Sequence, residues 1–345
     1  MRILIGTDAW LPQVNGVVRT LANLTAELAA MGHEVELVTP ADFRTIACPT
    51  YPQIRLAWAR RQAVLDRLRR FDPDIVHIAT EGPIGVQLRA ACLSIGKRFT
   101  TSFHTRFPEY VRSRAPVPLA LSYALLRRFH APATACLVTT EAMRADLSAR
   151  GFQRLATWTR GVDLSQFRPV EPVALDLPRP VFVTVSRLAP EKNIEGFLDL
   201  DLPGSKLVVG DGPALASLHR RYPTVHFAGA RTGEDLVRHY AAGDVFVFPS
   251  RTDTFGIVLI EALACGLPFA AFPEPGPVEI AGTGGAGAVS HDLRDACLRA
   301  LRIDPSLAIE RAQDFTWRAC AEDFLAAAET CRRARPLPEM AVMAA

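Results

Sequence analysis

The feature that most constrains this chain is an alternation of short apolar segments with segments of helical spacing, which occurs twice. In the first half, strand-like segments lie at residues 2–7, 34–39, 74–78, 98–102 and 136–139, and residues 16–31 have helical spacing. Strands that alternate with helices form parallel sheets covered by helices on both faces. The sequence therefore predicts an α/β protein.

The alternation pauses at a proline-rich segment and then starts again. Further strand-like segments lie at residues 181–185, 206–209, 226–228, 245–248 and 269–271. A chain of 345 residues also favours two domains over one. We predict Rossmann-like domains at 1–165 and 181–331 that face each other across a central cleft, a linker at 166–180, and a disordered tail at 332–345.

Composition excludes several classes of protein. No apolar run is long enough to span a bilayer, and the amino terminus is too short and strand-like for a signal peptide. The seven cysteines are scattered without a C-x-x-C pair, which indicates reduced thiols rather than disulfides or a zinc site. We therefore expect a cytoplasmic protein.

The net charge of +3 conceals an uneven distribution. Residues 1–163 contain 21 Lys and Arg against 13 Asp and Glu, a net charge of +8. The remaining residues contain 18 against 23, a net charge of −5. The two halves are therefore expected to bind different partners, although each arginine cluster is equally compatible with an ordinary solvated surface. No aromatic-interleaved basic module is present, so nucleic acid is not an expected partner.

Two cations follow the first strand of the second half. Arg187 and Lys192 lie in the segment 186–193 (SRLAPEKN), beyond the carboxyl end of the strand at 181–185. Open α/β sheets bind ligands at that edge, so the two side chains are placed to hold a pyrophosphate. The alternative is a surface ion pair with Glu191 or Glu195. The segment 210–213 (GDGP), which includes Gly212, is a second tight loop at the same edge.

Two carboxylates, Asp253 and Glu261, lie eight positions apart in the segment 249–268 (PSRTDTFGIVLIEALACGLP). Asp253 is predicted to lie in a loop and Glu261 in the first turns of a helix, whose amino terminus favours an anion. Carboxylates beside an anion site suit a ligand with both hydroxyls and phosphate, such as a nucleotide sugar. The first strand is not followed by G-x-G-x-x-G, which argues against an NAD(P) enzyme, but Gly16 can let a phosphate approach or serve as a turn glycine.

These motifs together resemble the family-4 retaining glycosyltransferases of the GT-B fold, over nearly the whole chain. The resemblance rests on the order of Arg187, Lys192, the loop at 210–213, and Asp253 with Glu261. The segments 12–20 (PQVNGVVRT), 73–77 (PDIVH), 81–85 (EGPIG) and 103–107 (FHTRF) fit its bacterial mannosyl- and diacylglycerol-glycosyltransferase branch. The family usually has Glu where this chain has Asp253, which shortens the reach of that carboxylate.

The resemblance implies a role for each matching residue. Arg187 and Lys192 would stabilise the leaving nucleoside diphosphate, and Gly16 and Gly212 would lie near the phosphates. Asp253 would bind hydroxyls of the donor sugar, and Glu261 would bind the ribose. Backbone groups of Thr254, Phe255 and Gly256 would contact the sugar or phosphates. His104 would lie near the sugar, with a buried structural histidine as the alternative, and Asp8 or Glu81 would orient the acceptor.

The implied reaction transfers a hexosyl group with retained configuration. It would proceed by attack on the same face within a short-lived ion pair, with the leaving phosphate accepting the acceptor's proton. Arg187 and Lys192 supply the positive charge, so no metal or other cofactor is expected. Neither D-x-D pattern indicates a metal site, because Asp199 and Asp201 end a helix and Asp72 and Asp74 precede a strand at its amino end.

The acceptor is predicted from residues 112–130, where arginine pairs bracket an apolar stretch. Such a segment suits the surface of an anionic membrane, and a helix packed inside the domain is the alternative. We predict a lipid acceptor such as diacylglycerol, with UDP-glucose, UDP-glucuronate or GDP-mannose as donor. The enzyme would then be peripheral on the inner face of the plasma membrane. Transfer to a soluble or polysaccharide acceptor and a non-catalytic nucleotide-sugar sensor remain as alternatives.

Overall fold

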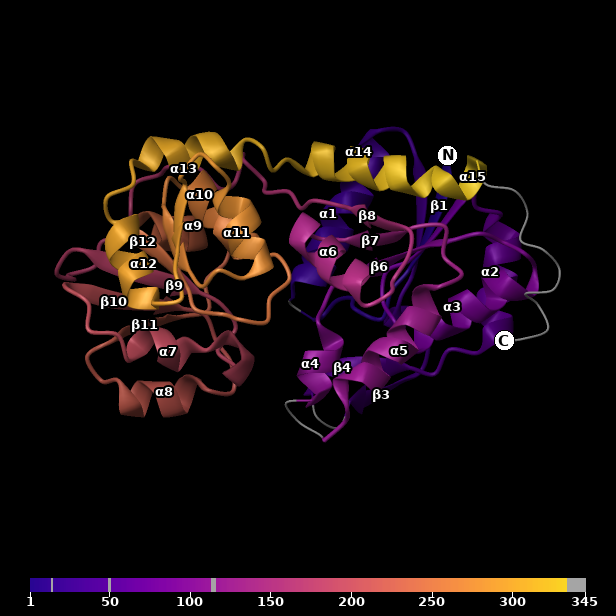
Figure 1. Cartoon of the computed structure of the whole chain (residues 1–345), viewed down its shortest axis with the longest axis horizontal. Helices are drawn as coiled ribbons and strands as arrows, with labels where there is room; N and C mark the ends of the chain where they lie inside the picture. Colours follow the sequence, from indigo (N-terminus) through magenta and orange to yellow (C-terminus); the bar gives the residue numbers. More distant parts are fainter. Residues whose placement is uncertain (14, 49–50, 113–115, 334–345) are drawn as a thin grey trace. The chain divides into compact units, whose positions relative to one another are not determined.

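The chain folds into two compact units, each built on its own parallel sheet (Figure 1). The structure is a computed structural model and describes residues 1–13, 15–48, 51–112 and 116–333. The first unit comprises Met1–Thr159 and Trp317–Ala345, and the second comprises Arg160–Thr316. The prediction of two Rossmann-like domains is confirmed.

The sheet of the first unit has six parallel strands in the order β2-β1-β5-β6-β7-β8. Its central strands are buried because helices cover both faces, and β6 differs from the others in burying mostly polar residues, Thr100, Thr101 and Ser102. The strands are β1 (Arg2–Gly6), β2 (Glu34–Val38), β5 (Ile75–Ile78), β6 (Thr100–Phe103), β7 (Cys136–Val138) and β8 (Leu155–Thr157).

The helices of the first unit connect these strands, and one antiparallel hairpin interrupts the alternation. The hairpin joins β3 (Thr45–Cys48) to β4 (Tyr51–Ala57), and it was not predicted. The α-helices bury one apolar face against the sheet, as amphipathic helices do. The helices are α1 (Gly16–Ala30), η1 (Pro40–Asp42), α2 (Arg61–Phe71), α3 (Pro83–Ser94), α4 (Phe107–Arg112), α5 (Leu119–His130) and α6 (Glu141–Ala149).

The end of the described chain returns to the first unit. Helix α14 (Trp317–Ala328) packs against α1 and is followed by α15 (Thr330–Arg333) (Figure 1). Trp317 and Phe324 join the same apolar core as Leu21 and Leu24. Residues 317–331 therefore do not belong to the second domain, to which the sequence assigned them, because their apolar face is buried in the first. Residues 334–345 of the predicted tail lie outside the described residues.

The sheet of the second unit also has six parallel strands, in the order β11-β10-β9-β12-β13-β14. The predicted linker at 166–180 has no helix or strand, but its Phe167 is buried in the core of this unit. The strands are β9 (Val181–Val185), β10 (Ser205–Val209), β11 (His226–Gly229), β12 (Val245–Phe248), β13 (Phe269–Ala271) and β14 (Gly287–Val289). The helices are η2 (Pro190–Lys192), α7 (Ile194–Leu198), α8 (Leu215–Arg221), α9 (Gly233–Ala241), α10 (Ile257–Ala264), α11 (Pro275–Ala281), α12 (Leu293–Ala300) and α13 (Pro305–Ala312).

Each sheet has a point at which the order of its strands reverses. In the second unit the reversal lies between β9 and β12, and in the first it lies between β1 and β5. The loops that leave two such strands diverge to opposite sides, and open α/β sheets bind ligands in the crevice between them. Ligand-binding residues are therefore expected in the loops after β9 and β12, and in those after β1 and β5.

Candidate active site

The loop after β9 carries both predicted phosphate-binding cations. Arg187 lies just after the strand, and Lys192 ends the short helix η2. The guanidinium of Arg187 is paired with the carboxylate of Glu191 one turn later. The ion pair that was the alternative for Arg187 is thus present. It keeps Arg187 at this edge of the sheet, where an anion would share the guanidinium with Glu191.

Lys192 contacts Asp253. The two residues lie in the loops after β9 and β12, which leave the sheet where its strand order reverses, the switch point of this sheet. Its Nζ donates to both carboxylate oxygens of Asp253, at 2.7 and 2.8 Å. Both side chains are partly exposed, so the pair is open to solvent. The fold therefore brings together a cation and a carboxylate that lie 61 positions apart in the sequence. A diphosphate that bound Lys192 would compete with Asp253 for it.

The loop after β12 leads directly into helix α10. Gly256 is the residue that caps this helix, and its φ of 93° lies in the left-handed region that glycine adopts without steric cost. Thr254 and Phe255 are buried, and the ring of Phe255 packs on Phe315 at 6.0 Å between centroids. Any contact of Phe255 with a ligand would therefore come from its backbone.

Gly212 permits a close approach between two neighbouring loops. A Cβ atom at this position would lie 2.4 Å from the carbonyl oxygen of Leu188. The same loops are joined by a hydrogen bond of 2.8 Å from the amide of Leu188 to the carbonyl oxygen of Asp211. The fold alone thus accounts for a glycine here, at the ligand-binding edge of the sheet where the sequence placed it.

The side chain of Glu261 is more deeply buried than that of Asp253. It is in the second turn of α10, and only 1% of its surface is exposed. The hydroxyl of Tyr240, which is itself fully buried on α9, donates to its Oε2 at 2.9 Å. A buried carboxylate requires such donors, and Tyr240 is a partner that the sequence alone did not indicate.

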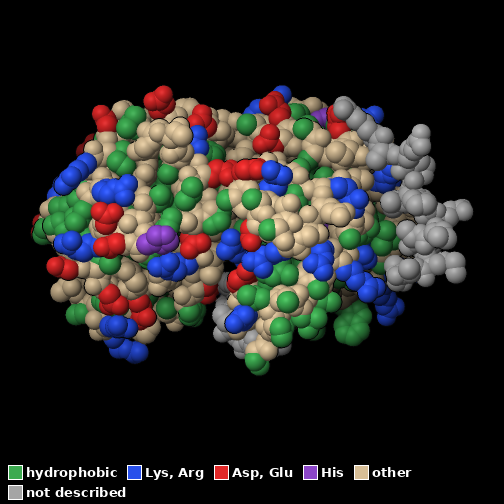
Figure 2. All heavy atoms as spheres, viewed as in Figure 1, with side chains coloured by type: hydrophobic (Ala, Val, Ile, Leu, Met, Phe, Trp, Pro, Cys, Tyr) green, Lys and Arg blue, Asp and Glu red, His purple; other side chains and the backbone are tan. Residues whose placement is uncertain are grey.

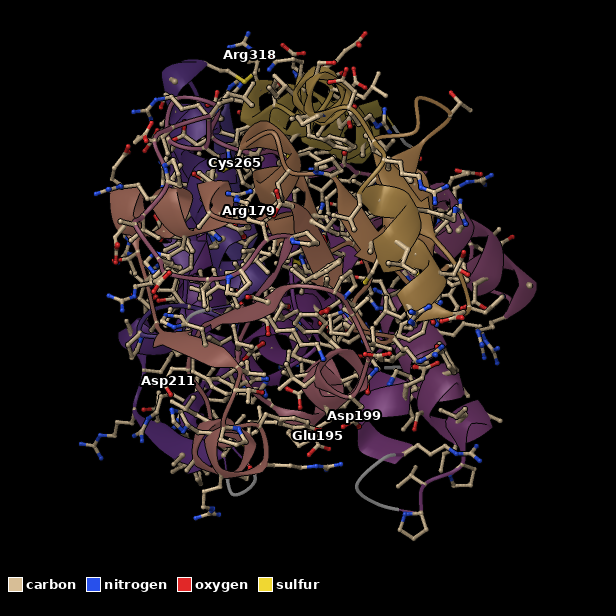
Figure 3. All side chains as sticks on the ribbon, turned by 90° about the vertical axis from the view of Figure 1, so that its left-hand side faces the viewer. Arg179, Glu195, Asp199, Asp211, Cys265 and Arg318 are labelled. Atoms are coloured by element: carbon tan, nitrogen blue, oxygen red, sulfur yellow. The ribbon has the colours of Figure 1, made fainter. Side chains whose placement is uncertain are left out.

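In each D-x-D pattern one aspartate is held by other groups of its own unit. Asp199 follows α7, where it accepts a hydrogen bond from the hydroxyl of Tyr222 and lies 3.7 Å from Arg221, which also contacts Glu195. Glu195 and Asp199 are labelled in Figure 3. Asp74 accepts from the backbone amide of Arg2 at the amino end of the first sheet. Within the described part of the chain, no group of three or more potential metal ligands occurs.

In the first unit, Asp8 caps a helix. Its carboxylate accepts hydrogen bonds from the backbone amides of Ile84 at 2.8 Å and Gly85 at 3.3 Å, and from the hydroxyl of Thr80 at 2.8 Å. Burial raises the pKa of Asp8, although the hydrogen bonds from Ile84 and Thr80 act in the opposite direction. These contacts account for Asp8 as the residue that closes the amino terminus of α3.

Glu81, the other predicted acceptor residue, lies 3.3 Å from Nε2 of His130. His130 is buried, and its Nδ1 lies 2.9 Å from the hydroxyl oxygen of Thr101. Burial by itself would lower the pKa of His130, but Cys136 and the carboxylate of Glu81 raise it to about 10. The pair ties the loop after β5 to the end of α5.

The remaining predicted residues of the first unit lie at the same edge of its sheet. His104 follows β6, is half-buried, and packs edge-on against Trp158 with 5.7 Å between ring centroids. Gly16 is the first residue of α1, and the side chain of Asn15 caps that helix by accepting from the amide of Val18. The structure thus brings Asp8, Glu81 and His104 to the ends of β1, β5 and β6.

Comparison with known proteins identifies the family. Residues 14–166 match the sequence profile of Glycosyltransferase Family 4, and residues 179–302 match that of Glycosyl transferases group 1. A GDP-mannose-dependent alpha-mannosyltransferase of Mycobacterium tuberculosis is 30% identical over 306 residues, which cover 81% of each chain. Sulfoquinovosyl transferase SQD2 of Arabidopsis thaliana is 29% identical, over 89% of this chain and 69% of the relative.

Solved structures share the fold. A sucrose-phosphate synthase of Thermosynechococcus elongatus superposes with a TM-score of 0.72 at 21% identity, over 94% of this chain and 97% of the other. Anabaena Alr3699/HepE in complex with UDP-glucose gives a TM-score of 0.68 at 16% identity, over 97% and 100%. With two parallel-sheet Rossmann-like units and a relative at this identity, the chain belongs to the family-4 glycosyltransferases of the GT-B fold.

Proposed function

We propose that this glycosyltransferase moves a hexose from a nucleotide sugar to a membrane lipid such as diacylglycerol, with retention of configuration. The observation that carries the proposal is the group of Arg187, Lys192 and Asp253 at the switch point of the second sheet. Two cations and a carboxylate at that edge match the diphosphate and the hydroxyls of a nucleotide sugar. The donor is UDP-glucose, UDP-glucuronate or GDP-mannose.

The cations would act mainly on the leaving group. As the bond to the sugar breaks, negative charge grows on the diphosphate, and Arg187 and Lys192 stabilise it. Asp253, displaced from Lys192 by the diphosphate, then binds sugar hydroxyls. The acceptor attacks the same face while the leaving phosphate takes its proton. No metal enters this scheme, so transfer should continue in the presence of EDTA.

The acceptor part of the proposal rests on the surface of α5. Leu121 and Leu125 lie one turn apart on this helix and are 54% and 62% exposed. Arg128, in the next turn, is also exposed, and Lys and Arg side chains gather around α3 and α5 on the face drawn in Figure 2. Exposed leucines beside arginines suit an anionic bilayer. Within the described residues, no helix has the length and apolar content to cross a membrane.

The names of the relatives include both a lipid acceptor and a mannose donor. An alpha-monoglucosyldiacylglycerol synthase of Streptococcus pneumoniae is 25% identical over 94% of this chain and 83% of the relative. The GDP-mannose-dependent alpha-mannosyltransferases among the relatives support GDP-mannose as the donor, and the second candidate is mannosyl transfer to a soluble or polysaccharide acceptor. For the first candidate, the enzyme would work as a peripheral protein on the inner face of the plasma membrane.

The test is a matrix of donors and acceptors. Purified enzyme is incubated with UDP-glucose, UDP-glucuronate or GDP-mannose, with diacylglycerol in anionic vesicles or with soluble mannosides, and release of nucleoside diphosphate is followed with and without EDTA. We expect release that requires vesicles carrying diacylglycerol, with an α-linked product by NMR. Release with mannosides alone selects the second candidate. Nucleotide-sugar binding without release under any condition would instead indicate a sensor.

A further inference from the structure

The two loops at the switch point of the second sheet are joined by hydrogen bonds besides the Lys192–Asp253 ion pair. The side-chain amide of Asn193 donates from Nδ2 to the carbonyl oxygen of Pro249, at 3.0 Å. The hydroxyl of Thr252 donates to the main-chain carbonyl of the residue before Lys192, at 3.3 Å. Each contact runs from the loop after β9 to the loop after β12, so the loops are held at a fixed spacing.

Asn193 has an unusual backbone conformation. Its φ of 51° and ψ of 39° are left-handed, and among the described residues only Asp72 and Arg154 share a positive φ without being glycine. Non-glycine residues in this region carry strain and persist only where the surroundings hold them, although Asn adopts it more readily than most, and such residues gather at functional sites. Glycine would relieve the strain, so the side chain is the reason for an asparagine at this position.

The fold leaves space for this side chain. Gly196 lies one turn later in α7, and a Cβ atom there would come within 2.7 Å of Nδ2 of Asn193. The amide therefore occupies a slot between α7 and the end of β12. Because Asn193 immediately follows Lys192, fixing its side chain also fixes the direction in which Lys192 leaves the loop.

We propose that Asn193 is a positioning residue of the donor site, whose amide anchors the loop after β9 on β12 and so sets Nζ of Lys192 opposite Asp253. The inference rests on the proposed function, in which Lys192 and Asp253 serve the donor. A displacement of about 1 Å in such a group can cost about 10²-fold in rate. Attraction between a cation and a diphosphate depends less on geometry, so the effect should fall on kcat rather than on nucleotide affinity.

The test compares Asn193→Gly with a matched control, Arg154→Gly. Arg154 is also left-handed, with a φ of 52°, and its guanidinium donates to the carbonyl oxygen of Ala131 in the first unit. Both changes remove a side-chain hydrogen bond to a carbonyl and leave a backbone that glycine adopts easily. For Asn193→Gly we expect kcat to fall at least about 10-fold, and the Kd for UDP or GDP by calorimetry to stay within about threefold. For Arg154→Gly we expect neither kcat nor the Kd for UDP or GDP to change.

A double-mutant cycle separates positioning from a general loss of structure. If Asn193 acts by positioning Nζ of Lys192, adding Asn193→Gly to Lys192→Ala should lower kcat little further. Additive losses, or an unchanged kcat in the single variant, overturn the proposal. A crystal structure of Asn193→Gly tests it without turnover, since the Lys192–Asp253 pair should be broken, and an intact pair refutes it. Wild type that transfers no sugar refutes the proposed function instead. Asn193→Asp is the second variant. Its carboxylate cannot donate a hydrogen bond to the carbonyl oxygen of Pro249, so kcat should fall in this variant too.

Discussion

Lys192 and Asp253 neutralise each other in this structure, and this alters what a substitution at either residue should do. Asp253→Asn removes the carboxylate that competes with a diphosphate for Nζ of Lys192. We expect turnover to fall while affinity for free UDP or GDP stays equal or rises. Glu261→Gln should weaken nucleotide binding more than turnover, because Glu261 is assigned to the ribose. Calorimetry and initial rates measure both, and equal effects of the two variants on affinity would refute this division.

Removal of either cation should affect the chemical step most. Arg187→Ala and Lys192→Ala each delete a charge that stabilises the leaving diphosphate, which typically costs about 10²–10³ in kcat. Arg221→Ala is the matched control, because Arg221 lies on α8, outside the loops after β9 and β12, and its ion pairs with Glu195 and Asp199 are exposed. Its kcat should remain at the wild-type level. If either site variant keeps near wild-type turnover with an intact fold, the assignment to the diphosphate is wrong.

His130 and Glu81 predict a pH dependence of stability. The pKa of His130 is raised in the folded state, so folded protein holds this proton more tightly than unfolded protein does. The resulting stabilisation is complete below the unfolded pKa of about 6.5 and declines as the pH rises toward the folded value. His130→Gln should therefore cost more free energy of unfolding at pH 6 than at pH 8.5.

Urea titrations of wild type and His130→Gln at the two pH values measure this difference. Glu81→Gln is the matched control, since it removes the carboxylate and leaves the imidazole. It should reduce the pH dependence without creating a cavity. A destabilisation by His130→Gln that is the same at both pH values would show that the imidazole contributes only by packing.

At the scale of the element, helix α3 depends on a residue far away in the sequence. Asp8 closes its amino terminus through the amides of Ile84 and Gly85. Loss of such a cap costs about 0.5–2 kcal/mol. Asp8→Ala should therefore lower the melting temperature by a few degrees, whereas Asp8→Asn, which keeps an oxygen acceptor, should lower it less. An acceptor-binding role would show as a raised acceptor KM in Asp8→Asn at a temperature where this variant is fully folded.

The elements that the sequence predicted best are the buried central strands. The predicted segments 181–185, 245–248 and 269–271 coincide with β9, β12 and β13, because a continuous apolar run between turns leaves few alternatives. The hairpin of β3 and β4 was missed since Ile46 is exposed and Pro52 and Arg55 interrupt the pattern. Strands β8 and β14 are edge strands and only partly buried, so, unlike the equally short β13, they have no continuous apolar run that would predict them.

The sequence predicted where the candidate site residues lie in the fold, but not which of them contact one another. Motif spacing predicted that Arg187, Lys192 and Asp253 lie in loops at the carboxyl edge of the second sheet, and the structure has them there. The spacing did not indicate that Lys192 would contact Asp253 or that Tyr240 would bind Glu261. Such contacts join loops and helices that are distant in sequence, so they depend on strand order, which local patterns do not specify.

At the scale of the whole chain, local patterns did not predict which of the two units the last helices join. Residues 317–331 have ordinary helical spacing and follow the second unit without a proline-rich break. Only the burial of Trp317 and Phe324 among side chains of α1 shows that they complete the first unit. An apolar helical face does not identify its partner, and sequence proximity favoured the wrong one.

The uneven charge of the two halves leads to a prediction for the whole molecule. The more basic first 163 residues include α5 with its exposed Leu121 and Leu125, which should dock on anionic lipid. Each Lys or Arg near such a surface contributes about 1 kcal/mol. Reversing Arg112 and Arg128 to Glu should therefore lower partitioning onto vesicles by at least about 30-fold, since 1.4 kcal/mol is a factor of ten. Arg114, in the same basic segment, lies outside the described residues.

Co-sedimentation with phosphatidylserine vesicles at low and high salt measures this docking. The matched control reverses Arg220 and Arg302, two exposed arginines of the second unit, and so changes the net charge equally. Wild type and control should sediment at low salt and be released at high salt, because charges beyond a Debye length are screened. A variant with Leu121 and Leu125 changed to Ser should bind less at either salt. If wild type stays in the supernatant at low salt, the lipid acceptor loses its physical support, and transfer to a soluble or polysaccharide acceptor becomes the better explanation of this enzyme.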